Sequence, residues 1–151
     1  MKTQKMIITV GYPGSGKSTL VSQIKREFPE LNIVNGDRLR DLLRKEIVYF
    51  DSLEFSQMSP EVKRANDIAK EYKRLVIQEL IRSEQSLLVE GNHLEIKARE
   101  KWFSAAREIN PDIKVAILYL KINDSELLER YKDREKSDKK SAWISEFKKW
   151  R

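Results

Sequence analysis

The chain has 151 residues and a formal net charge of +6, with 36% charged and 40% hydrophobic residues. This length suits one domain with one core, so we expect a single domain over residues 1–151. The chain has no cysteine, which excludes disulfides and zinc–thiolate sites. No apolar run approaches the roughly 20 residues of a membrane span, and the first predicted strand leaves no room for a signal peptide, so we expect a cytoplasmic protein. The positive charge favours a polyanionic partner such as nucleic acid.

The first predicted elements are a strand, a glycine-rich loop and a helix. Residues 6–10 are apolar and rich in β-branched side chains, which is typical of a buried strand. Residues 11–18 read GYPGSGKS and fit the Walker A pattern G-x-x-x-x-G-K-[ST]. An amphipathic helix follows, and its expected apolar positions are Leu20, Val21, Ile24 and Phe28. This order of elements predicts a P-loop.

The residue types of the loop suit phosphate binding. Glycines let backbone N–H groups turn inward around phosphate oxygens, and the helix N-terminus adds a positive dipole end. Lys17 is expected to reach the β- and γ-phosphates, and the Ser18 hydroxyl to ligate Mg²⁺. The remaining predicted nucleotide contacts in the loop and first turn are Gly14, Ser15, Gly16 and Thr19. The alternative is a glycine-rich turn without a ligand, but the flanking strand and helix favour ATP binding.

A second strand at residues 32–35 leads into a helix with leucines at helical spacing. Asp37 lies at this junction, where it can be the helix N-cap, a carboxylate at the ligand-binding edge of a parallel sheet, or both. Arg40 follows three residues later, on the same side of the helix. A base beside an anion anchor is what a phosphate-acceptor site needs.

The middle of the chain combines an irregular stretch with a long helix. Residues 48–58 contain aromatic side chains that suit either core packing or stacking on a base. A helix is predicted from the Ser59 cap and Pro60 to about residue 82. The other face of this helix is rich in Lys and Glu and is expected to be solvated. Its expected inward positions are Ile68, Tyr72, Leu75, Val76 and Leu80.

A third strand is predicted at residues 86–90 and is followed by Gly91, Asn92 and His93. Glu90 and Asn92 should emerge beside the P-loop, where Glu90 could hold a water on Mg²⁺ and Asn92 could hydrogen-bond the acceptor. No apolar strand ends in aspartate as a Walker B strand does, and Glu90 is the nearest equivalent. A lone histidine in such a turn is more typical of a capping or surface residue than of a catalytic one.

The rest of the chain continues the alternation of strands and helices. We expect a helix over residues 96–109, a strand over 114–120 and a helix capped by Asn123. The pattern predicts an α/β fold, with a parallel sheet of about four strands flanked by helices. The charged run 130–140 is either a solvated helix end or a small lid, with Arg130 and Arg134 one helical turn apart. An amphipathic helix over 142–151 suits a core or a subunit contact, so a homo-oligomer is one expectation.

Together these motifs resemble the P-loop kinases of the phage polynucleotide 5′-kinase type. The matching segments cover most of the chain in the same order and comprise GYPGSGKST at 11–19, NGDRLR at 35–40, EGN at 90–92 and RYKDR at 130–134. The family often has Asp-x-Asn where this chain has Glu90-Gly91-Asn92. The chain also lacks an Asp-x-Asp motif with room for the phosphatase domain of the larger phage enzymes, so the resemblance implies a kinase-only version.

The resemblance implies transfer of the γ-phosphate of ATP to the 5′-hydroxyl of DNA or RNA. It implies that Asp37 is the general base, that Arg40 contacts an acceptor phosphate, and that Arg134 contacts ATP and the transition state. Two alternatives stay open at this point. One is a kinase of a nucleoside, sugar or nucleotide-sugar, as in zeta-toxin-like kinases. The other is a nucleotide-binding ATPase or switch that transfers nothing.

Overall fold

The computed structural model describes residues 3–47 and 60–137. The expectations for residues 48–58, for the Ser59 cap and for the helix over 142–151 lie outside these residues. The four strands are β1 (Lys5–Val10), β2 (Asn32–Asn35), β3 (Leu87–Glu90) and β4 (Lys114–Tyr119). The five helices of the described part are α1 (Lys17–Glu27), α2 (Gly36–Ile47), α3 (Pro60–Arg82), α4 (Ile96–Ile109) and α5 (Asp124–Ser137).

The strands form one parallel sheet in the order β2-β3-β1-β4. Met6 of β1 is level with Leu87 on one neighbour and with Val115 on the other. All four carboxyl ends therefore meet at one edge of the sheet. This confirms the predicted α/β class, and the edge is where ligands bind in open parallel sheets.

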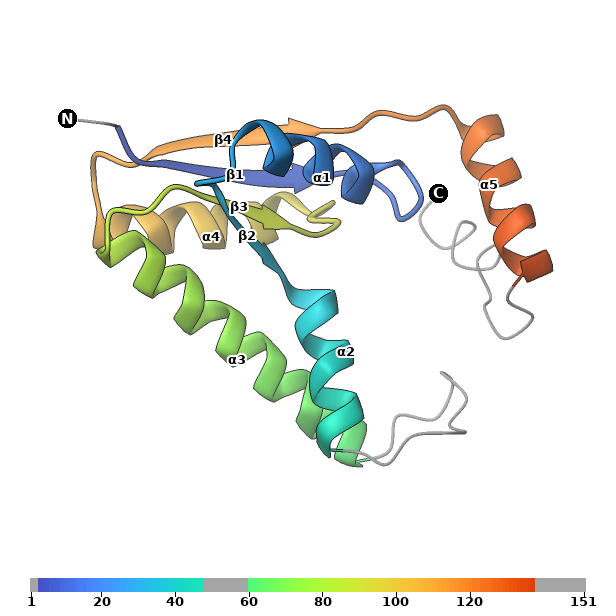
Figure 1. The fold of residues 1–151 in the computed structure, drawn as a ribbon, viewed down its shortest axis with the longest axis horizontal. Helices are drawn as coiled ribbons and strands as arrows, with labels where there is room; N and C mark the ends of the chain where they lie inside the picture. Colours follow the sequence, from blue (N-terminus) through green and yellow to red (C-terminus); the bar gives the residue numbers. More distant parts are fainter. Residues whose placement is uncertain (1–2, 48–59, 138–151) are drawn as a thin grey trace.

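Helices cover both faces of the sheet (Figure 1). Met6 and Ile8 of β1 point to the face that α3 and α4 cover, where they pack in the larger apolar cluster with Ile77 and Ala106. On the opposite face, Val21 of α1 packs in a smaller cluster with other apolar side chains. The side chains of β1 and β3 alternate between the two clusters, as expected for strands buried on both faces. In β4, at the edge of the sheet, Ile117 and Tyr119 are instead 48% and 59% exposed.

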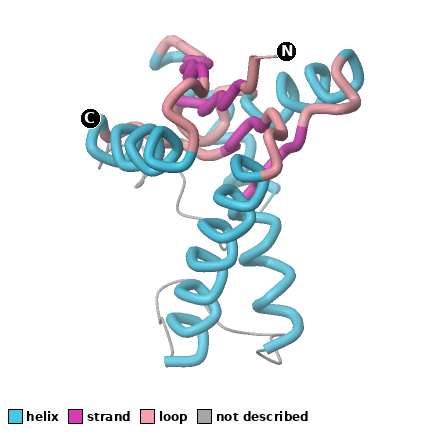
Figure 2. Tube along the Cα trace, turned by 90° about the vertical axis from the view of Figure 1, so that its left-hand side faces the viewer, coloured by secondary structure: helices cyan, strands magenta, loops and turns pink. Residues whose placement is uncertain are grey.

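Helices α2 and α3 pack against each other and project away from the sheet as a pair (Figures 1 and 2). The first turn of α2 stays at the carboxyl edge of the sheet, directly after β2. The P-loop, the start of α2 and the turn after β3 therefore belong to the same end of the molecule. None of the helices in the described part is both long and apolar enough to cross a membrane.

The predicted inward face of α3 is wrong in part, because Val76 and Leu80 pack against the larger apolar cluster but the other three side chains are exposed. Ile68, Tyr72 and Leu75 are 40%, 54% and 49% exposed. The side chains of α3 that are buried instead are Val62, Ala65, Ala69, Ile77 and Ile81. Small alanines let the helix approach its neighbours closely, whereas a hydropathy pattern weights the larger side chains. The buried stripe is consequently rotated from the predicted one.

Phe28 is a second correction. It was expected on the apolar face of α1, but it lies at the C-cap of that helix and is 51% exposed. Its backbone N–H donates to the Ile24 carbonyl and closes the last turn. The buried side of α1 is therefore made by Val21, with Ile24 partly buried beside it.

Candidate active site

The P-loop joins the end of β1 to the start of α1. Gly14 and Gly16 have φ angles of +82° and +96°, and Gly16 is the N-cap residue of α1. Both angles lie in the left-handed region, which glycine adopts at little cost. The motif therefore has the strand, loop and helix context that the sequence predicts. Thr19 lies exposed in the first turn of α1, and Ser15 donates its backbone N–H to the Tyr12 carbonyl at 3.1 Å.

Lys17 is folded back over the start of the loop. Its ammonium donates to the carbonyl oxygens of Gly11 and Tyr12 at 2.9 and 2.6 Å, and the residue is buried. Burial lowers the pKa of Lys17 to about 8, against the opposing charges of Glu90 and Asp37, which raise it. A lysine held in this way presents its charge at the loop where phosphate oxygens are expected.

Ser18 is linked to α2 through two side chains. The Ser18 hydroxyl donates to Glu90 Oε1 at 2.5 Å, and the Asn35 amide donates to Glu90 Oε2 at 2.7 Å. Glu90 is buried, and both of its oxygens accept a hydrogen bond. Because the Ser18 proton points to Glu90, the lone pairs of the hydroxyl oxygen are available to a hard cation. Magnesium takes few protein ligands and keeps several waters, so this donor set fits it.

Asn35, rather than Asp37, is the N-cap of α2. Its side-chain oxygen accepts hydrogen bonds from the backbone N–H groups of Asp37 and Arg38, at 2.9 and 3.0 Å. The helix begins at Gly36, so Asp37 is already in the first turn. The capping alternative for Asp37 is thus wrong, and the signal that indicates the true cap is an asparagine directly before the helix start.

The Asp37 side chain is instead paired with Arg40. Arg40 Nη2 lies 2.7 Å from Asp37 Oδ1, and 69% of the aspartate side chain is exposed. This confirms that the two residues share one side of α2. Arg40 Nε is buried without a hydrogen-bond partner in the described part of the chain. The pair therefore places a carboxylate and a guanidinium together, open to solvent, at the carboxyl edge of the sheet.

The turn after β3 is hydrogen-bonded to the start of the P-loop. The Asn92 backbone carbonyl accepts from the Gly11 backbone N–H at 3.1 Å, and the Asn92 side chain is exposed. The Thr9 hydroxyl donates to the Gly91 carbonyl at 2.9 Å and accepts from the Gly91 N–H at 3.0 Å. These contacts couple the position of Glu90 to that of the P-loop.

His93 is half-buried in this turn, which corrects the surface or capping assignment. Its Nδ1 lies 3.0 Å from the Thr9 carbonyl oxygen and donates to it, because a carbonyl can only accept. Burial lowers the pKa of His93, and the charges of Lys73, Lys17 and Arg99 lower it further. The neutral ring is therefore a fixed part of the turn.

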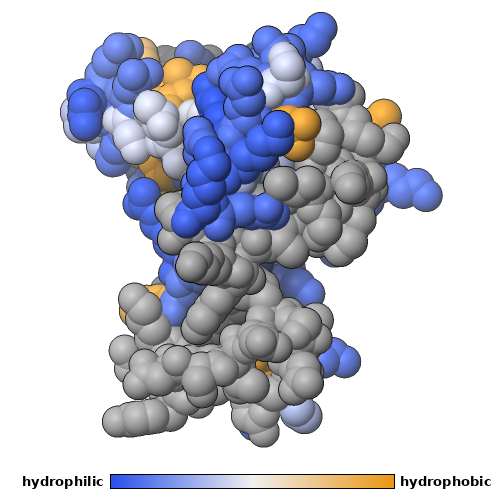
Figure 3. All heavy atoms as spheres, turned by 90° about the vertical axis from the view of Figure 1, so that its right-hand side faces the viewer, coloured by the Kyte–Doolittle hydropathy of each residue, from blue (hydrophilic) through white to orange (hydrophobic). Residues whose placement is uncertain are grey.

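Helix α5 lies against the P-loop. Leu127 and Tyr131 are fully buried, and the Tyr131 hydroxyl donates to the Pro13 carbonyl at 2.6 Å. Arg130 Nη1 donates to the Gly14 carbonyl at 2.7 Å. A Cβ built on Gly14 would come within 3.6 Å of Arg134 Nη1. Both arginines of the predicted lid therefore meet the loop, and the coloured surface on this side of the molecule is mostly hydrophilic (Figure 3).

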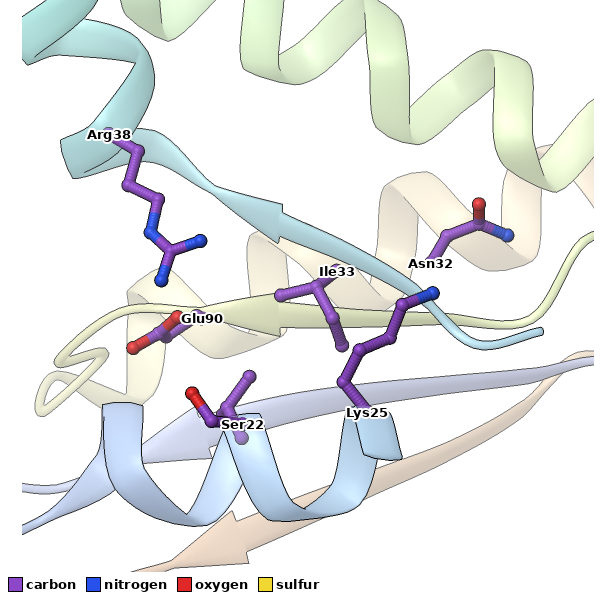
Figure 4. Close-up of a pocket in the computed structure, with 7 residues that line it drawn as sticks. Ser22, Lys25, Asn32, Ile33, Arg38 and Glu90 are labelled. Atoms are coloured by element: carbon purple, nitrogen blue, oxygen red, sulfur yellow. The ribbon is translucent and has the colours of Figure 1, made fainter. Parts of the chain in front are cut away.

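A groove of about 400 Å³ lies between α1 and β2, and Glu90 is at one end of it. Arg38 extends from the first turn of α2 toward Glu90, while Ser22 and Lys25 reach in from α1 (Figure 4). The Lys25 ammonium donates to the Leu31 carbonyl at 2.8 Å, which holds it at the far end. The groove thus opens beside the Ser18–Glu90 contact, on the opposite side of the sheet from α3.

Three residues of the site were missed by the sequence reasoning: Asn35, Tyr131 and Lys73. Asn35 and Tyr131 act through contacts with Glu90 and Pro13, which are 55 and 118 residues away in the chain. Lys73 of α3 lies close to Gly36, at the start of α2. The sequence feature that indicates Lys73 is a lysine within the buried stripe of α3, and it can be recognised only when that stripe is known.

Two sequence comparisons bear on the family. A family model described as an AAA domain matches residues 7–151, which is nearly the whole chain. A comparison with curated protein sequences found no match.

Solved structures share the fold. A protein from Chloroflexus aurantiacus described as a candidate kinase has a TM-score of 0.71 and 20% identity, over 94% of this chain and 72% of that one. A chain of the Pnkp1/Rnl/Hen1 RNA repair complex has a TM-score of 0.74 and 21% identity, over 99% and 43%. A chain of the PezAT toxin–antitoxin system of Streptococcus pneumoniae has a TM-score of 0.65 and 20% identity, over 95% and 58%.

At these identities the structural likeness shows the fold alone. This chain spans less than two thirds of the RNA repair and toxin–antitoxin chains. The family match, by contrast, includes the P-loop, the Asp37–Arg40 pair and α5. The chain therefore belongs to the AAA domain family and has a P-loop kinase-like fold.

Proposed function

We propose that the chain is an ATP-dependent kinase that transfers the γ-phosphoryl group to the 5′-hydroxyl of a polynucleotide. The observation that carries the proposal is the Asp37–Arg40 pair, with 2.7 Å between its atoms, on a helix tied through Asn35 and Glu90 to Ser18. A proton acceptor beside an anion anchor suits an acceptor that carries both a hydroxyl and a phosphate.

The P-loop would bind ATP, the phosphoryl donor. The backbone N–H groups of Gly14, Gly16 and the first turn of α1 would surround the phosphates of ATP, whereas that of Ser15 already donates to Tyr12. Lys17 would contact the β- and γ-phosphates. Ser18 would hold magnesium, which would supply positive charge against the transferred group. Glu90 orients the Ser18 hydroxyl through the 2.5 Å hydrogen bond and would hold a water of the metal site.

The transfer is an in-line displacement. The acceptor oxygen forms a bond to the γ-phosphorus while the bond from phosphorus to the β–γ bridging oxygen breaks, and ADP leaves with that electron pair. Asp37 takes the proton of the attacking hydroxyl, and Asn92 holds the acceptor by a hydrogen bond. Arg134, with Arg130 beside it at Gly14, stabilises the charge on the leaving phosphates.

The charge of the chain favours a polynucleotide acceptor. The chain has a net charge of +6, and Arg40 stands beside the candidate base, where a phosphate next to the reacting hydroxyl would bind. The presence of a similar fold in an RNA repair complex is in keeping with such an acceptor. A neutral small molecule would make no use of Arg40.

The test is transfer of labelled γ-phosphate from ATP, with Mg²⁺, to a 5′-hydroxyl oligonucleotide. Nucleosides, sugars and nucleotide-sugars are assayed in parallel. Asp37→Asn is expected to lower transfer by about 10²-fold or more, as for loss of a general base. Asp41→Asn is the matched control, because Asp41 is an exposed carboxylate of the same helix.

Each result decides between the candidate functions. Labelled oligonucleotide that disappears with Asp37→Asn but not with Asp41→Asn supports the proposal. Label found only on a small molecule keeps phosphoryl transfer and rejects the polynucleotide acceptor. ATP binding with no labelled product would favour a nucleotide-binding switch.

A further inference from the structure

Lys73 occupies a core position on a helix on which most of the other charged side chains that the structure describes are exposed. The buried side chains of α3 are three or four residues apart from Val62 to Ile81, except for a gap of eight between Ala69 and Ile77, and Lys73 falls midway in that gap. The residue is half-buried as a consequence. A lysine in such a stripe is unusual, because lysines are rarely buried unless they are paired.

The Lys73 side chain reaches from α3 to the start of α2 and to α4. A Cβ built on Gly36 would lie 3.0 Å from Lys73 Cδ and 3.5 Å from Nζ. The ammonium lies 5.4 Å from the centre of the Trp102 ring. A residue larger than glycine at position 36 would therefore push the lysine away, and glycine leaves it room to pass beneath the first turn of α2.

The Lys73 charge is poorly compensated. Within residues 3–47 and 60–137, its ammonium makes no hydrogen bond or ion pair, and it is stabilised by the Trp102 ring and by the charge of Asp37. Burial lowers the pKa of Lys73, and the charge of Asp37 raises it. An ammonium removed from water without a partner costs free energy, which a bound anion would offset.

The space beside Lys73 is accessible. Lys73 lines a cavity of about 170 Å³ between β2, α2 and α3, where it and Asn35 are the polar side chains beside the mainly apolar wall of Ile33, Val34, Leu39, Tyr72 and Val76. Asn35 is also the cap of α2 and the partner of Glu90. The cavity therefore adjoins the same first turn of α2 that carries Asp37.

We propose that Lys73 is a second anion contact of the acceptor site, which with Arg40 selects acceptors that carry a phosphate next to the reacting hydroxyl. This inference rests on the proposed function, because it assigns Lys73 to the acceptor of that reaction. Arg40 is paired directly with Asp37, and Lys73 approaches the same turn from beneath Gly36. Two cations on different elements would hold the acceptor phosphate from two sides.

The kinetic test compares Lys73→Met with the wild-type chain, because methionine keeps an unbranched stem and removes the charge. Lys70→Met is the matched control, since Lys70 lies on the same helix, is 79% exposed and pairs with Asp67. The acceptors are a 5′-hydroxyl oligonucleotide, a nucleoside 3′-monophosphate and the same nucleoside without phosphate. We expect Lys73→Met to raise the KM of the two phosphate-bearing acceptors about 10- to 100-fold. The KM of ATP and the turnover of the bare nucleoside should not change.

A packing role predicts a different result. If Lys73 only supports Trp102, Lys73→Met will lower the unfolding temperature and affect all acceptors and ATP alike. That outcome would overturn the proposal, and so would an unchanged KM for the phosphate-bearing acceptors.

A binding measurement separates this inference from the proposed function. Nucleoside 3′-monophosphate and nucleoside are titrated into protein saturated with a non-hydrolysable ATP analogue. Tighter binding of the monophosphate that Lys73→Met abolishes supports the anion contact, even if no oligonucleotide is phosphorylated and the proposed function fails. Equal binding of the two compounds to the wild-type chain rejects the anion contact, whatever the assay of transfer shows.

Discussion

Asn35 and Glu90 face each other at the carboxyl ends of β2 and β3, and the Asn35 amide donates a 2.7 Å hydrogen bond to Glu90 Oε2. The other oxygen of Glu90 accepts from Ser18, and the other end of Asn35 caps α2. One buried carboxylate and one amide thus connect the phosphate-binding loop to the helix that carries Asp37.

Loss of the Asn35 amide is expected to destabilise the fold. Asn35→Ala removes the cap of α2 and one hydrogen bond to buried Glu90, so the free energy of unfolding should fall by about 1–3 kcal/mol in urea denaturation. Asn35→Asp keeps the oxygen that caps α2 but places a second carboxylate beside Glu90, which repels it. The free energy of unfolding of this variant should therefore also lie below that of the wild-type chain. Two variants with wild-type stability would contradict the arrangement.

The lowered pKa of Lys17 should make the affinity for ATP depend on pH. With its pKa lowered to about 8 by burial, Lys17 is charged at pH 7 and largely neutral at pH 9. The affinity of the free protein for ATP should therefore fall about 10-fold between these pH values, measured by equilibrium titration. Lys17→Arg stays charged and should show a flat profile across this range. A flat profile for the wild-type chain would refute the role given to Lys17.

Lys17 should also make the free energy of unfolding depend on pH. Its pKa is about 8 in the folded chain and 10.5 ordinarily, so the unfolded chain binds more protons between these values. The free energy of unfolding should therefore rise with pH through this window, as far as Lys17 determines it. Denaturation at pH 8 and pH 10 for wild type and Lys17→Met isolates the contribution, which the variant should lack.

Tyr131 is expected to fasten α5 to the P-loop. Tyr131→Phe removes the 2.6 Å hydrogen bond to Pro13 and should cost about 0.5–1.5 kcal/mol of unfolding free energy. It should also weaken ATP binding, because the bond holds the loop itself. Tyr72→Phe is the control, since Tyr72 is 54% exposed. Equal results for the two variants would show that the Tyr131 hydroxyl contributes nothing.

Arg134 should act on the rate of transfer. Arg134→Ala is expected to lower kcat about 10²- to 10³-fold at saturating ATP, the usual scale for a charge-stabilising donor. Lys132→Ala, an exposed cation on the same helix, should leave kcat within about 2-fold. A variant of Arg134 with wild-type kcat would remove this residue from the catalytic group.

Ser18 should set the magnesium requirement. Chelation of divalent cations is expected to abolish transfer, and Ser18→Ala should raise the Mg²⁺ concentration needed for half-maximal activity. Ser18→Thr keeps the hydroxyl and should restore the wild-type requirement. Ser22→Ala is the control, because Ser22 is exposed one turn further along α1 and donates to the Ser18 carbonyl. An unchanged requirement in Ser18→Ala would contradict the metal assignment.

Local features of the site could be predicted from the sequence. The strand, loop and helix around Lys17 follow from short-range patterns, because the φ angles of Gly14 and Gly16 and the start of α1 depend on neighbouring residues. The Asp37–Arg40 pair follows from helical spacing in the same way. The alternation of apolar strands and amphipathic helices was also sufficient for the parallel α/β class.

Packing between distant segments decided the buried face of α3 and the long-range hydrogen bonds of the site. Periodicity shows that α3 has an apolar stripe, but only contact with the sheet and α4 selects the stripe with Ala65, Ala69 and Lys73 over the one with Ile68 and Tyr72. The links from Asn35 to Glu90 and from Tyr131 to Pro13 join residues far apart in the chain. The linear pattern predicted that Glu90 would lie beside the P-loop, but not that Asn35 would bind it. The sequence by itself therefore determined the P-loop and the α/β class, because these depend on local patterns, and the tertiary structure alone decided which distant side chains hold the loop in place.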